Sequence, residues 1–332
     1  AAQWNSFAAR QAAAARRGRL RGIGLCNYIE GAGGGAGEYA AVTLGADGIA
    51  RIGAGCVDQG QGQRSSLRQI AAERLGLGED RFQVVDSDTD LIKDGVGTNA
   101  SRSMVRAGQA LVEAIDRLID AGRPHAARLL QAEGTEITYR DGRYHAGGGR
   151  SVGLDETARA APSQTLFADS RSHADAVTYP NGCHVCEVEI DPETGAVSII
   201  AFTAVDDVGR AINPAIVRGQ SQGGIAQGIG QALLEQAVVD AQTGQVLTGS
   251  FLDYAVPRAA TLPRLTPISN DFPSPTNALG VKGAGEGGAT GAPVAVINAV
   301  LDALATAGVK DIALPATPER IWQALRDAQA RR

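Results

Sequence analysis

The chain has 332 residues, of which 44% are hydrophobic and 20% are charged. At roughly 150 residues per domain, this length predicts two domains or one large one, with enough apolar sequence for a sizeable core. The formal net charge is −5, which gives nucleic acid no overall attraction. No apolar run approaches about 20 residues, which argues against contact with a membrane through a spanning helix. Four cysteines are too few for a disulfide scaffold, and they indicate the reduced thiols of a cytoplasmic protein.

Residues 1–35 predict an N-terminal helix and a connecting strand. Asn5 or Ser6 can cap an alanine-rich helix that reaches Arg17, and a strand-like stretch follows it. The next segment, 31–37, contains five glycines and two alanines. Such a segment indicates a loop that lies close to a ligand or to other backbone.

Residues 36–150 predict a first subdomain that begins with a hairpin. Two strand-like segments, 38–44 and 49–57, flank the turn residues Asp47 and Gly48. A loop rich in glycine and glutamine then leads into a helix that ends near Leu75. The remaining elements are a short strand at 82–85, a polar loop at 86–99, a helix at 101–121, a further helix from Pro124 and a hairpin at 136–145.

Residues 151–176 lack periodicity and are predicted to be a linker, after which the order hairpin, polar loop, helix is repeated. The second hairpin combines 183–190 with 197–205, and its polar loop reaches Asn213 and Pro214, an N-cap followed by proline at the first helical position. The later elements are a strand at 251–255, an apolar helix at 292–307 and a closing helix from Thr317. We therefore predict an α+β fold of two related mixed α/β subdomains that face a cleft, the second spanning 177–332.

The most informative stretch is 280–288, in which five of nine residues are glycine and only Lys282 and Glu286 are ionisable. Glycines let a large rigid ligand approach the backbone. A carboxylate with so few polar residues near it in the sequence is predicted to be desolvated. Desolvation would raise the pKa of Glu286 and suit it to be a general base. The alternative is that Glu286 only lies in the first turn of the next helix, where the helix dipole favours negative charge.

Residues 283–288 also match the GxGxxG pattern of dinucleotide-binding proteins, which would indicate a nucleotide-dependent dehydrogenase. That pattern needs a hydrophobic strand directly before it. The preceding segment, 270–277, is rich in proline and serine and does not have a strand pattern. A dehydrogenase is therefore kept as an alternative, together with a non-catalytic assembly subunit that retains the fold.

Other glycine-rich or hydroxyl-rich segments lie at the predicted starts of helices or inside one. Backbone N–H groups at 59–62 and 97–103 could bind an anion such as phosphate, and the Gln61 amide could pair with the edge of a heterocycle. The alternative for both segments is that they cap their own helices. At 222–228 the glycines lie inside a helix, where each costs about 1 kcal/mol relative to alanine, so we expect close packing or a ligand there.

In chain order these segments resemble the molybdenum hydroxylases, the family of xanthine dehydrogenase, aldehyde oxidase and carbon monoxide dehydrogenase. The resemblance is to the C-terminal half of the large molybdopterin-binding subunit and covers nearly the whole chain. The motifs that carry it are Gly60-Gln-Gly62, Asp88-Thr-Asp90, Gly97-Thr98, Ser101-Arg-Ser103, Asp207-Val-Gly209, Asn213-Pro214, Gln227-Gly228 and Gly283-Ala-Gly-Glu286.

The resemblance implies that Glu286 is the catalytic base beside the molybdenum, which the pterin holds without protein side chains as ligands. Leu25 and Tyr28 are expected in the wall of the substrate pocket. Residues expected to contact the cofactor are Gln59, Gly60, Gln61, Gly62, Thr98, Ala100, Ser101, Arg102, Ser103, Gln227, Lys282 and Gly285.

The chemistry implied by the resemblance is hydroxylation of an aldehyde or an N-heterocycle with oxygen derived from water. Glu286 would take the proton of a Mo–OH group whose oxygen attacks the substrate carbon, and hydride would pass to Mo=S. The implied cofactor is molybdopterin with molybdenum, in its simple form or as the cytosine dinucleotide, with Fe-S clusters and FAD on partner chains. The implied partners are the other half of the molybdopterin subunit, an iron–sulfur subunit and an FAD subunit. This chain alone would then hold half a site and bind the cofactor weakly.

Overall fold

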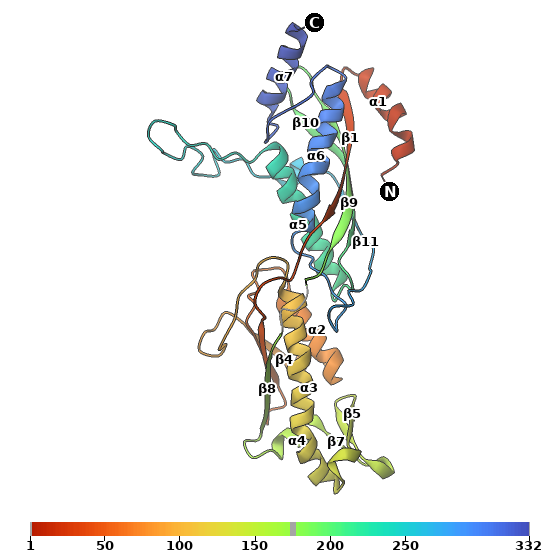
Figure 1. Ribbon diagram of the computed structural model, residues 1–332, viewed down its shortest axis with the longest axis vertical. Coiled ribbons are helices and arrows are strands. Elements are labelled where there is room, and N and C mark those ends of the chain that lie inside the picture. Colours follow the sequence, from red (N-terminus) through yellow and green to blue (C-terminus); the bar gives the residue numbers. More distant parts are fainter. Residues whose placement is uncertain (1, 173–176, 332) are drawn as a thin grey trace.

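The structure is a computed structural model that describes residues 2–172 and 177–331. Figure 1 shows an elongated molecule in which two α/β units lie end to end, each with helices packed on a sheet. The two main sheets have four strands each, and a small sheet of three strands, β5-β6-β7, lies at the end of the first unit. The predicted α+β fold with two mixed subdomains is confirmed.

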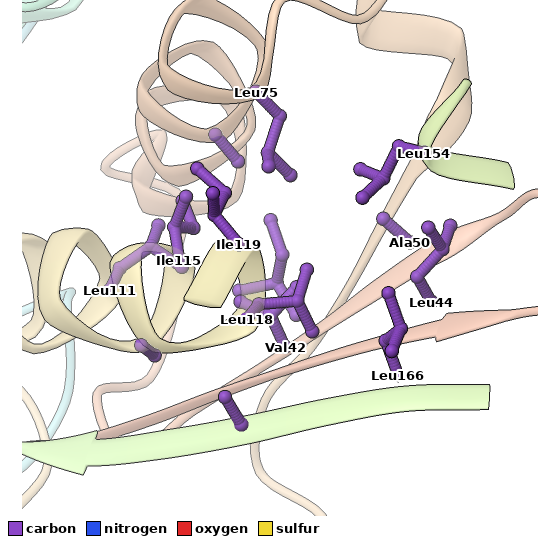
Figure 2. Packing of buried hydrophobic residues seen from close by; sticks show 14 of the residues in the cluster. Val42, Leu44, Ala50, Leu75, Leu111, Ile115, Leu118, Ile119, Leu154 and Leu166 are labelled. Carbon is purple, nitrogen blue, oxygen red and sulfur yellow. The ribbon is translucent and has the colours of Figure 1, made fainter. Parts of the chain in front are cut away.

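The first subdomain is built on the sheet β4-β3-β2-β8. Helix α3 packs on β2 and β8, and α2 packs against α3 and β4. Leu111, Ile115 and Leu118 recur on one face of α3 and belong to the same core as Val42 of β2, beside which Leu118 lies (Figure 2), as expected of an amphipathic helix on a sheet. The bounds are β2 (Tyr39–Gly45), β3 (Ala50–Ala54), α2 (Gln63–Leu75), η2 (Glu79–Arg81), β4 (Phe82–Val85), α3 (Ser103–Leu130), η3 (Gly134–Glu136), β5 (Thr138–Arg140), β6 (Arg143–His145), η4 (Gly147–Gly149), β7 (Ser151–Gly153), α4 (Leu154–Arg159) and β8 (Thr165–Arg171).

The second subdomain is built on the sheet β1-β9-β10-β11. Helix α6 packs on β1 and β9 and against α5. A second core of buried apolar side chains fills the space between these helices and the sheet. The bounds are η1 (Trp4–Ser6), α1 (Phe7–Ala15), β1 (Leu20–Ile29), β9 (Asn181–Ile190), β10 (Val197–Asp207), α5 (Pro214–Leu233), η5 (Ala259–Thr261), β11 (Leu265–Ser269), α6 (Gly287–Ala305) and α7 (Pro318–Ala330).

The two main sheets share one pairing pattern. An edge strand pairs antiparallel with the first hairpin strand, β8 with β2 and β1 with β9. The two hairpin strands pair antiparallel, and the second of them pairs parallel with a strand reached through a helix, β3 with β4 and β10 with β11. The predicted internal repeat is therefore present, with α2 equivalent to α5 and α3 equivalent to α6.

The predicted boundaries need two corrections. The expected linker at 151–176 contains β7, α4 and β8, and β8 pairs with β2 from Thr165 to Arg171; residues 173–176 of that range lie outside the described residues. The expected separate segment at 1–35 contains β1, which pairs with β9 along its length. Both strands complete a sheet whose other strands are distant in sequence, so no local pattern identifies their partners.

Three local predictions also differ from the structure. Helix α3 continues through Pro124, because Ala126, Ala127 and Leu130 are buried on the far side of the proline and hold the last turns in place. Residues 251–255 form turns in place of a strand, in a loop that projects from the body of the molecule (Figure 1). Helix α6 begins at Gly287 rather than at residue 292.

Helix α6 is long and apolar enough to cross a membrane by length and composition alone, which corrects the expectation that no segment approaches that length. Half of its apolar window is buried inside the protein. Its contacts with β1, β9 and α5 make it the central helix of the second core, and this packing accounts for its apolar composition.

Candidate functional site

A cavity of about 580 Å³ lies where the two subdomains meet. Its wall comes from the loops before α2 and α3 in the first subdomain and before α5 and α6 in the second. Because these helices correspond in pairs, equivalent loops of the two repeats enclose it, as the predicted cleft requires. The predicted site residues on the wall are Gln59, Gly60, Gln61, Thr98, Ala100, Ser101, Ser103, Lys282, Gly285 and Glu286.

Asp58 closes the loop before α2. Its carboxylate accepts hydrogen bonds from the backbone N–H groups of Gly60 at 2.9 Å, Gly62 at 3.3 Å and Arg64 at 2.9 Å. The Gln61 amide is also engaged within this segment, since its Nε2 donates to the Val57 carbonyl at 3.1 Å. Of the N–H groups predicted to bind an anion at 59–62, those of Gly60 and Gly62 are therefore occupied by a carboxylate of this chain and that of Gln59 by the Gln61 side chain, which favours the capping alternative for this segment.

The loop before α3 is held by Thr98. Its hydroxyl donates to the Val57 carbonyl at 2.7 Å and accepts from Gln63 Nε2 at 3.1 Å. Ala100 and Ser101 then adopt positive φ angles of 48° and 50°, a conformation that is uncommon for residues with a Cβ atom. No described side chain caps the N-terminus of α3, so its first N–H groups, beside the cavity, can meet an anion.

Arg102 does not lie on the cavity wall, which corrects its prediction as a cofactor contact. Its guanidinium donates to Glu38 Oε2 at 2.9 Å and to the Ala36 carbonyl, and both charged side chains are buried. Since positive φ at Ala100 and Ser101 turns the chain, consecutive residues have different roles. Ser101 and Ser103 line the cavity, while Arg102 anchors the loop from behind.

Glu286 occupies the N-cap position of α6, and its exposed side chain lies on the cavity wall. Ser101 Oγ donates a hydrogen bond to Glu286 Oε2 at 3.0 Å across the subdomain boundary. A Cβ atom at Gly285 would lie 3.0 Å from Ser101 Oγ, and one at Gly283 would lie 2.8 Å from Ser101 Cβ. The glycines therefore permit this close approach, and the prediction of a desolvated carboxylate without polar neighbours is wrong for this chain.

Glu30 does not line the described cavity wall, but it acts on a carboxyl group that does, and no sequence motif singled it out. It follows β1, and Glu286 and Ser101 are the two side chains that act on the pKa of its carboxyl group. Burial and the Glu286 carboxyl raise the pKa of Glu30 to about 7, against a smaller opposite effect of Ser101. Its Oε2 atom is buried and has no hydrogen-bond donor among the described residues. One feature of the sequence could have identified Glu30: it is an acidic residue next to the glycine-rich segment 31–37, and an acidic residue among glycines is also what singled out Glu286.

Lys282 lines the cavity, but its charge already has a partner in this chain. Its Nζ lies 2.5 Å from Asp207 Oδ2. Burial opposes the ionised form of Asp207, yet Lys282 and the N–H groups of Gly209 and Phe272 outweigh it and hold the pKa of Asp207 below its ordinary value. Lys282 therefore anchors the loop before α6 to the end of β10.

Four further predicted residues lie off the described cavity wall. Alternation along β1 places Leu25 and Tyr28 on opposite faces. Leu25 is 39% exposed, whereas the Tyr28 hydroxyl donates to Asp206 Oδ1 at 2.8 Å beneath the start of α6. Gln227 is exposed on α5. Gly62 lies under the wall, where a Cβ atom would be 2.5 Å from Ile216 Cδ1.

The cavity has further polar lining residues from both subdomains. Asn213 caps α5 through the N–H groups of residues 215 and 216 and donates to Gln69 at 3.1 Å. Arg210 pairs with Glu73 at 3.1 Å, so both residues also link the subdomains. The lining residues that were not predicted as contacts include Gln63, Ser66, Asn99, Met104, Arg210, Asn213 and Gln220.

The GxGxxG segment lacks the structural context of a dinucleotide site. The last strand before it, β11, ends at Ser269, and an isolated bridge between Gly209 and Val281 precedes Gly283 in the described chain. Dinucleotide binding requires a strand that runs directly into the glycine turn. This geometry counts against the dehydrogenase alternative.

Comparisons with known proteins give a consistent result. A family model described as the molybdopterin cofactor-binding domain matches residues 1–263. The chain is 37% identical over 316 residues to the gamma subunit of the 6-hydroxypseudooxynicotine dehydrogenase complex of Paenarthrobacter nicotinovorans, covering 92% of this chain and 40% of that protein. It is 33% identical over 288 residues to the carbon monoxide dehydrogenase large chain of Hydrogenophaga pseudoflava, covering 84% of this chain and 36% of that one.

Solved structures agree with these sequence relatives. Quinoline 2-oxidoreductase from Pseudomonas putida 86 matches with a TM-score of 0.89 at 32% identity, covering 98% of this chain and 44% of that one. Carbon monoxide dehydrogenase from Oligotropha carboxidovorans matches with a TM-score of 0.90 at 28% identity, covering 99% and 44%. The chain thus spans less than half the length of the relatives and structures that it matches.

Proposed function

The chain belongs to the molybdopterin-binding family of the molybdenum hydroxylases, and from this premise we propose that it forms half of an oxidoreductase site with Glu286 as the general base. The observation that carries the proposal is the position of Glu286 on a cavity between equivalent helix N-termini of the two repeats. The base would serve hydroxylation of a small molecule with water-derived oxygen.

The residues present fit a large anionic cofactor such as molybdopterin. The N-termini of α3 and α6 both lie at the cavity, and no described side chain caps either of them. Helix N-termini attract phosphate through their N–H groups and dipoles. Small residues such as Gly60, Ala100 and Gly285 leave room for flat rings along the wall. When bound, molybdopterin with its molybdenum would supply the two-electron chemistry.

The side chains of this chain would orient the reacting groups and move one proton. Ser101 holds Oε2 of Glu286 through its hydroxyl, which leaves Oε1 to accept a proton from the oxygen nucleophile. Ser103 and Asn99 offer hydrogen bonds to the cofactor, and Gln59 and Gln61 lie on the opposite part of the wall. A general base in this position contributes about 10²- to 10⁴-fold to the rate.

The substrate class that we propose is an N-heterocycle. The nicotine 6-hydroxylase large subunit of Paenarthrobacter nicotinovorans is 32% identical over 356 residues, and quinoline 2-oxidoreductase is 32% identical. Aldehyde oxidoreductases from Desulfovibrio match at only 24% and 25% identity. These names support a ring substrate over an aldehyde.

The proposal includes partner chains. The rest of a molybdopterin subunit would close the cavity, and an iron–sulfur subunit and an FAD subunit would carry the electrons away. The short span of this chain relative to its matched relatives supports this division. We expect this chain alone to bind the cofactor weakly, and mass analysis of the cofactor extracted from the complex would distinguish molybdopterin from its cytosine dinucleotide.

The test is Glu286→Gln in the assembled complex. We expect unchanged molybdenum and pterin content with kcat/KM lowered about 10²- to 10⁴-fold. Glu113→Gln is the matched control, because Glu113 is a half-buried glutamate of α3 that is held by Ser170 and Gln109 and does not line the described cavity wall. Full cofactor content with wild-type turnover in Glu286→Gln would refute the role as base.

A further inference from the structure

Glu30, Ser101 and Glu286 come from three separate elements and meet at one point. Glu30 follows β1, Ser101 precedes α3, and Glu286 begins α6. The backbone of Glu30 is fixed, since its N–H donates to the Pro180 carbonyl at 2.9 Å and the preceding strand pairs with β9 along its whole length. The facing carboxyl groups are thus placed by the fold rather than by flexible loops alone.

The face of β1 that carries Glu30 is the one pressed against α6. A Cβ atom at Gly22 or Gly24 would lie 2.1 or 2.2 Å from the α6 backbone. Tyr28, on the same face two residues before Glu30, lies so close to α6 that a Cβ atom at Gly287 would be 2.3 Å from its hydroxyl. Strand alternation therefore directs Glu30 toward the start of α6, where Glu286 lies.

We propose that Glu30 and Glu286 form a carboxyl pair that shares one proton, in which Glu30 is the positioning residue that holds the carboxyl of Glu286. The proposal rests on the proposed role of Glu286 as the base. Glu30 acts through Glu286, and Ser101 joins the pair as a hydroxyl donor.

The physical reason is repulsion between two neighbouring like charges. Two adjacent carboxyl groups lose their protons in separate steps, because the second ionisation must work against the first charge. The pKa of Glu30 is raised to about 7 by burial and by Glu286. Below that pH, Glu30 keeps its proton and can donate it in a hydrogen bond to the Glu286 carboxyl. Above it, the pair has lost that proton and can hold the one that Glu286 accepts.

Charged side chains on the elements around the pair have partners of their own. Lys282 pairs with Asp207. On β10, Asp206 accepts from Tyr28 and contacts His184 Nε2 at 2.9 Å. The two arginines at the start of α3 are also engaged: Arg102, at the N-cap, binds Glu38, and Arg106 Nε donates to the Gly33 carbonyl at 2.5 Å. We therefore assign to this carboxyl pair the change in protonation that is expected near pH 7.

The first experiment is Glu30→Gln in the assembled complex, because glutamine has the same shape and stays neutral at every pH. In the wild type, kcat/KM should rise as the pH passes about 7. Glu30→Gln should keep its molybdenum content and lose this rise, with kcat/KM lower by about tenfold at pH 8 and nearly unchanged at pH 6. Glu30→Asp still titrates and should keep the rise at a displaced pH.

The second experiment measures thermal unfolding of the same proteins against pH and needs no turnover. The folded-state pKa of Glu30 is raised above its ordinary value of 4.5, so its contribution to stability is complete below that value and is lost as the pH rises through about 7. The Tm of the wild type should therefore fall relative to that of Glu30→Gln between pH 5 and pH 8. The control variant Glu113→Gln should show the same fall as the wild type.

The outcomes separate this inference from the proposed function. Glu286→Gln removes the neighbouring charge, so the pH at which the wild-type Tm falls should move lower, whether or not turnover depends on Glu286. If Glu30→Gln keeps both the rise in kcat/KM and the fall in Tm near pH 7, or if Glu30→Asp behaves like Glu30→Gln, the shared-proton pair is overturned. Wild-type turnover in Glu286→Gln would instead refute the base assignment alone.

Discussion

The guanidinium of Arg102 donates to Glu38 Oε2 at 2.9 Å, and the two side chains are only 2% and 0% exposed. Glu38 Oε1 in turn accepts from the backbone N–H groups of Tyr39 and Val96. This ion pair links the start of β2 to the two loop segments, 94–96 and 99–102, that lead toward the cavity. It places Arg102 behind the cavity wall, although its neighbours Ser101 and Ser103 lie on it.

We predict that Arg102→Met lowers the free energy of unfolding by about 3–5 kcal/mol, because it leaves the buried Glu38 carboxylate without its cation. Adding Glu38→Gln should recover part of this loss, since the amide oxygen can still accept from the backbone while the unpaired charge is gone. Denaturant unfolding of both variants is the measurement. Wild-type stability combined with loss of cofactor in Arg102→Met would instead restore the direct cofactor contact that the sequence predicted.

The ion pair between Lys282 and Asp207 predicts a loss of stability in acid. The folded-state pKa of Asp207 lies below its ordinary value of 3.8, so its stabilising contribution is complete above that value and is lost as the pH falls through the folded-state pKa. Lys282→Met should lower the free energy of unfolding at pH 7. In this variant the loss of stability in acid should also begin at a higher pH than in the wild type. Unfolding free energies between pH 2 and pH 7 test this.

Lys310→Met is the control for this prediction, because it removes one exposed lysine charge far along the chain from the cavity loops. It should leave the acid limb of the stability curve where the wild type has it. Equal displacement of the curve by both variants would attribute the effect to net charge and contradict the role of the Asp207 pair.

Glycines of α5 are predicted to differ in their effects on stability. A Cβ atom at Gly228 would lie 2.7 Å from Ala292 Cβ and 2.8 Å from Pro293 Cδ on α6, whereas one at Gly223 would have no atom within 4 Å. Gly228→Ala should therefore lower the free energy of unfolding by about 1–3 kcal/mol through overpacking. Gly223→Ala should raise it by up to about 1 kcal/mol through helix propensity. Chemical unfolding of the isolated chain should separate the two, and equal effects would contradict the packing argument.

The hairpins and most of the helices could be predicted because their signals are local. Alternating apolar residues and turn residues such as Asp47 and Gly48 indicate β2 and β3, and Asn213 with Pro214 indicates the start of α5. Repetition of these signals also predicted the two related subdomains. The edge strands β1 and β8 were assigned to separate segments, because pairing with β9 and β2 depends on contacts that no short stretch of sequence contains.

The candidate site was predicted in outline. The glycine-rich helix starts that the sequence singled out line the cavity together with Ser101 and Glu286. The sequence could not tell which N–H groups were already occupied by Asp58, nor that Arg102 turns away from its neighbours. It also could not show that Glu30 lies near Glu286, because these residues are distant in sequence and are brought together only by the close packing of β1 on α6.

By itself, the amino-acid order determined where strands turn, where most helices start and which segments contain unusual glycines, since steric limits and hydrogen bonds within a few residues decide these features. Only the tertiary structure decided which loops of the two repeats face each other and which charges are paired. It also decided that the carboxyl groups of Glu30 and Glu286 are neighbours, of which only that of Glu286 lies on the described cavity wall. These outcomes depend on packing and like-charge repulsion between residues far apart along the chain, where local preference has no influence.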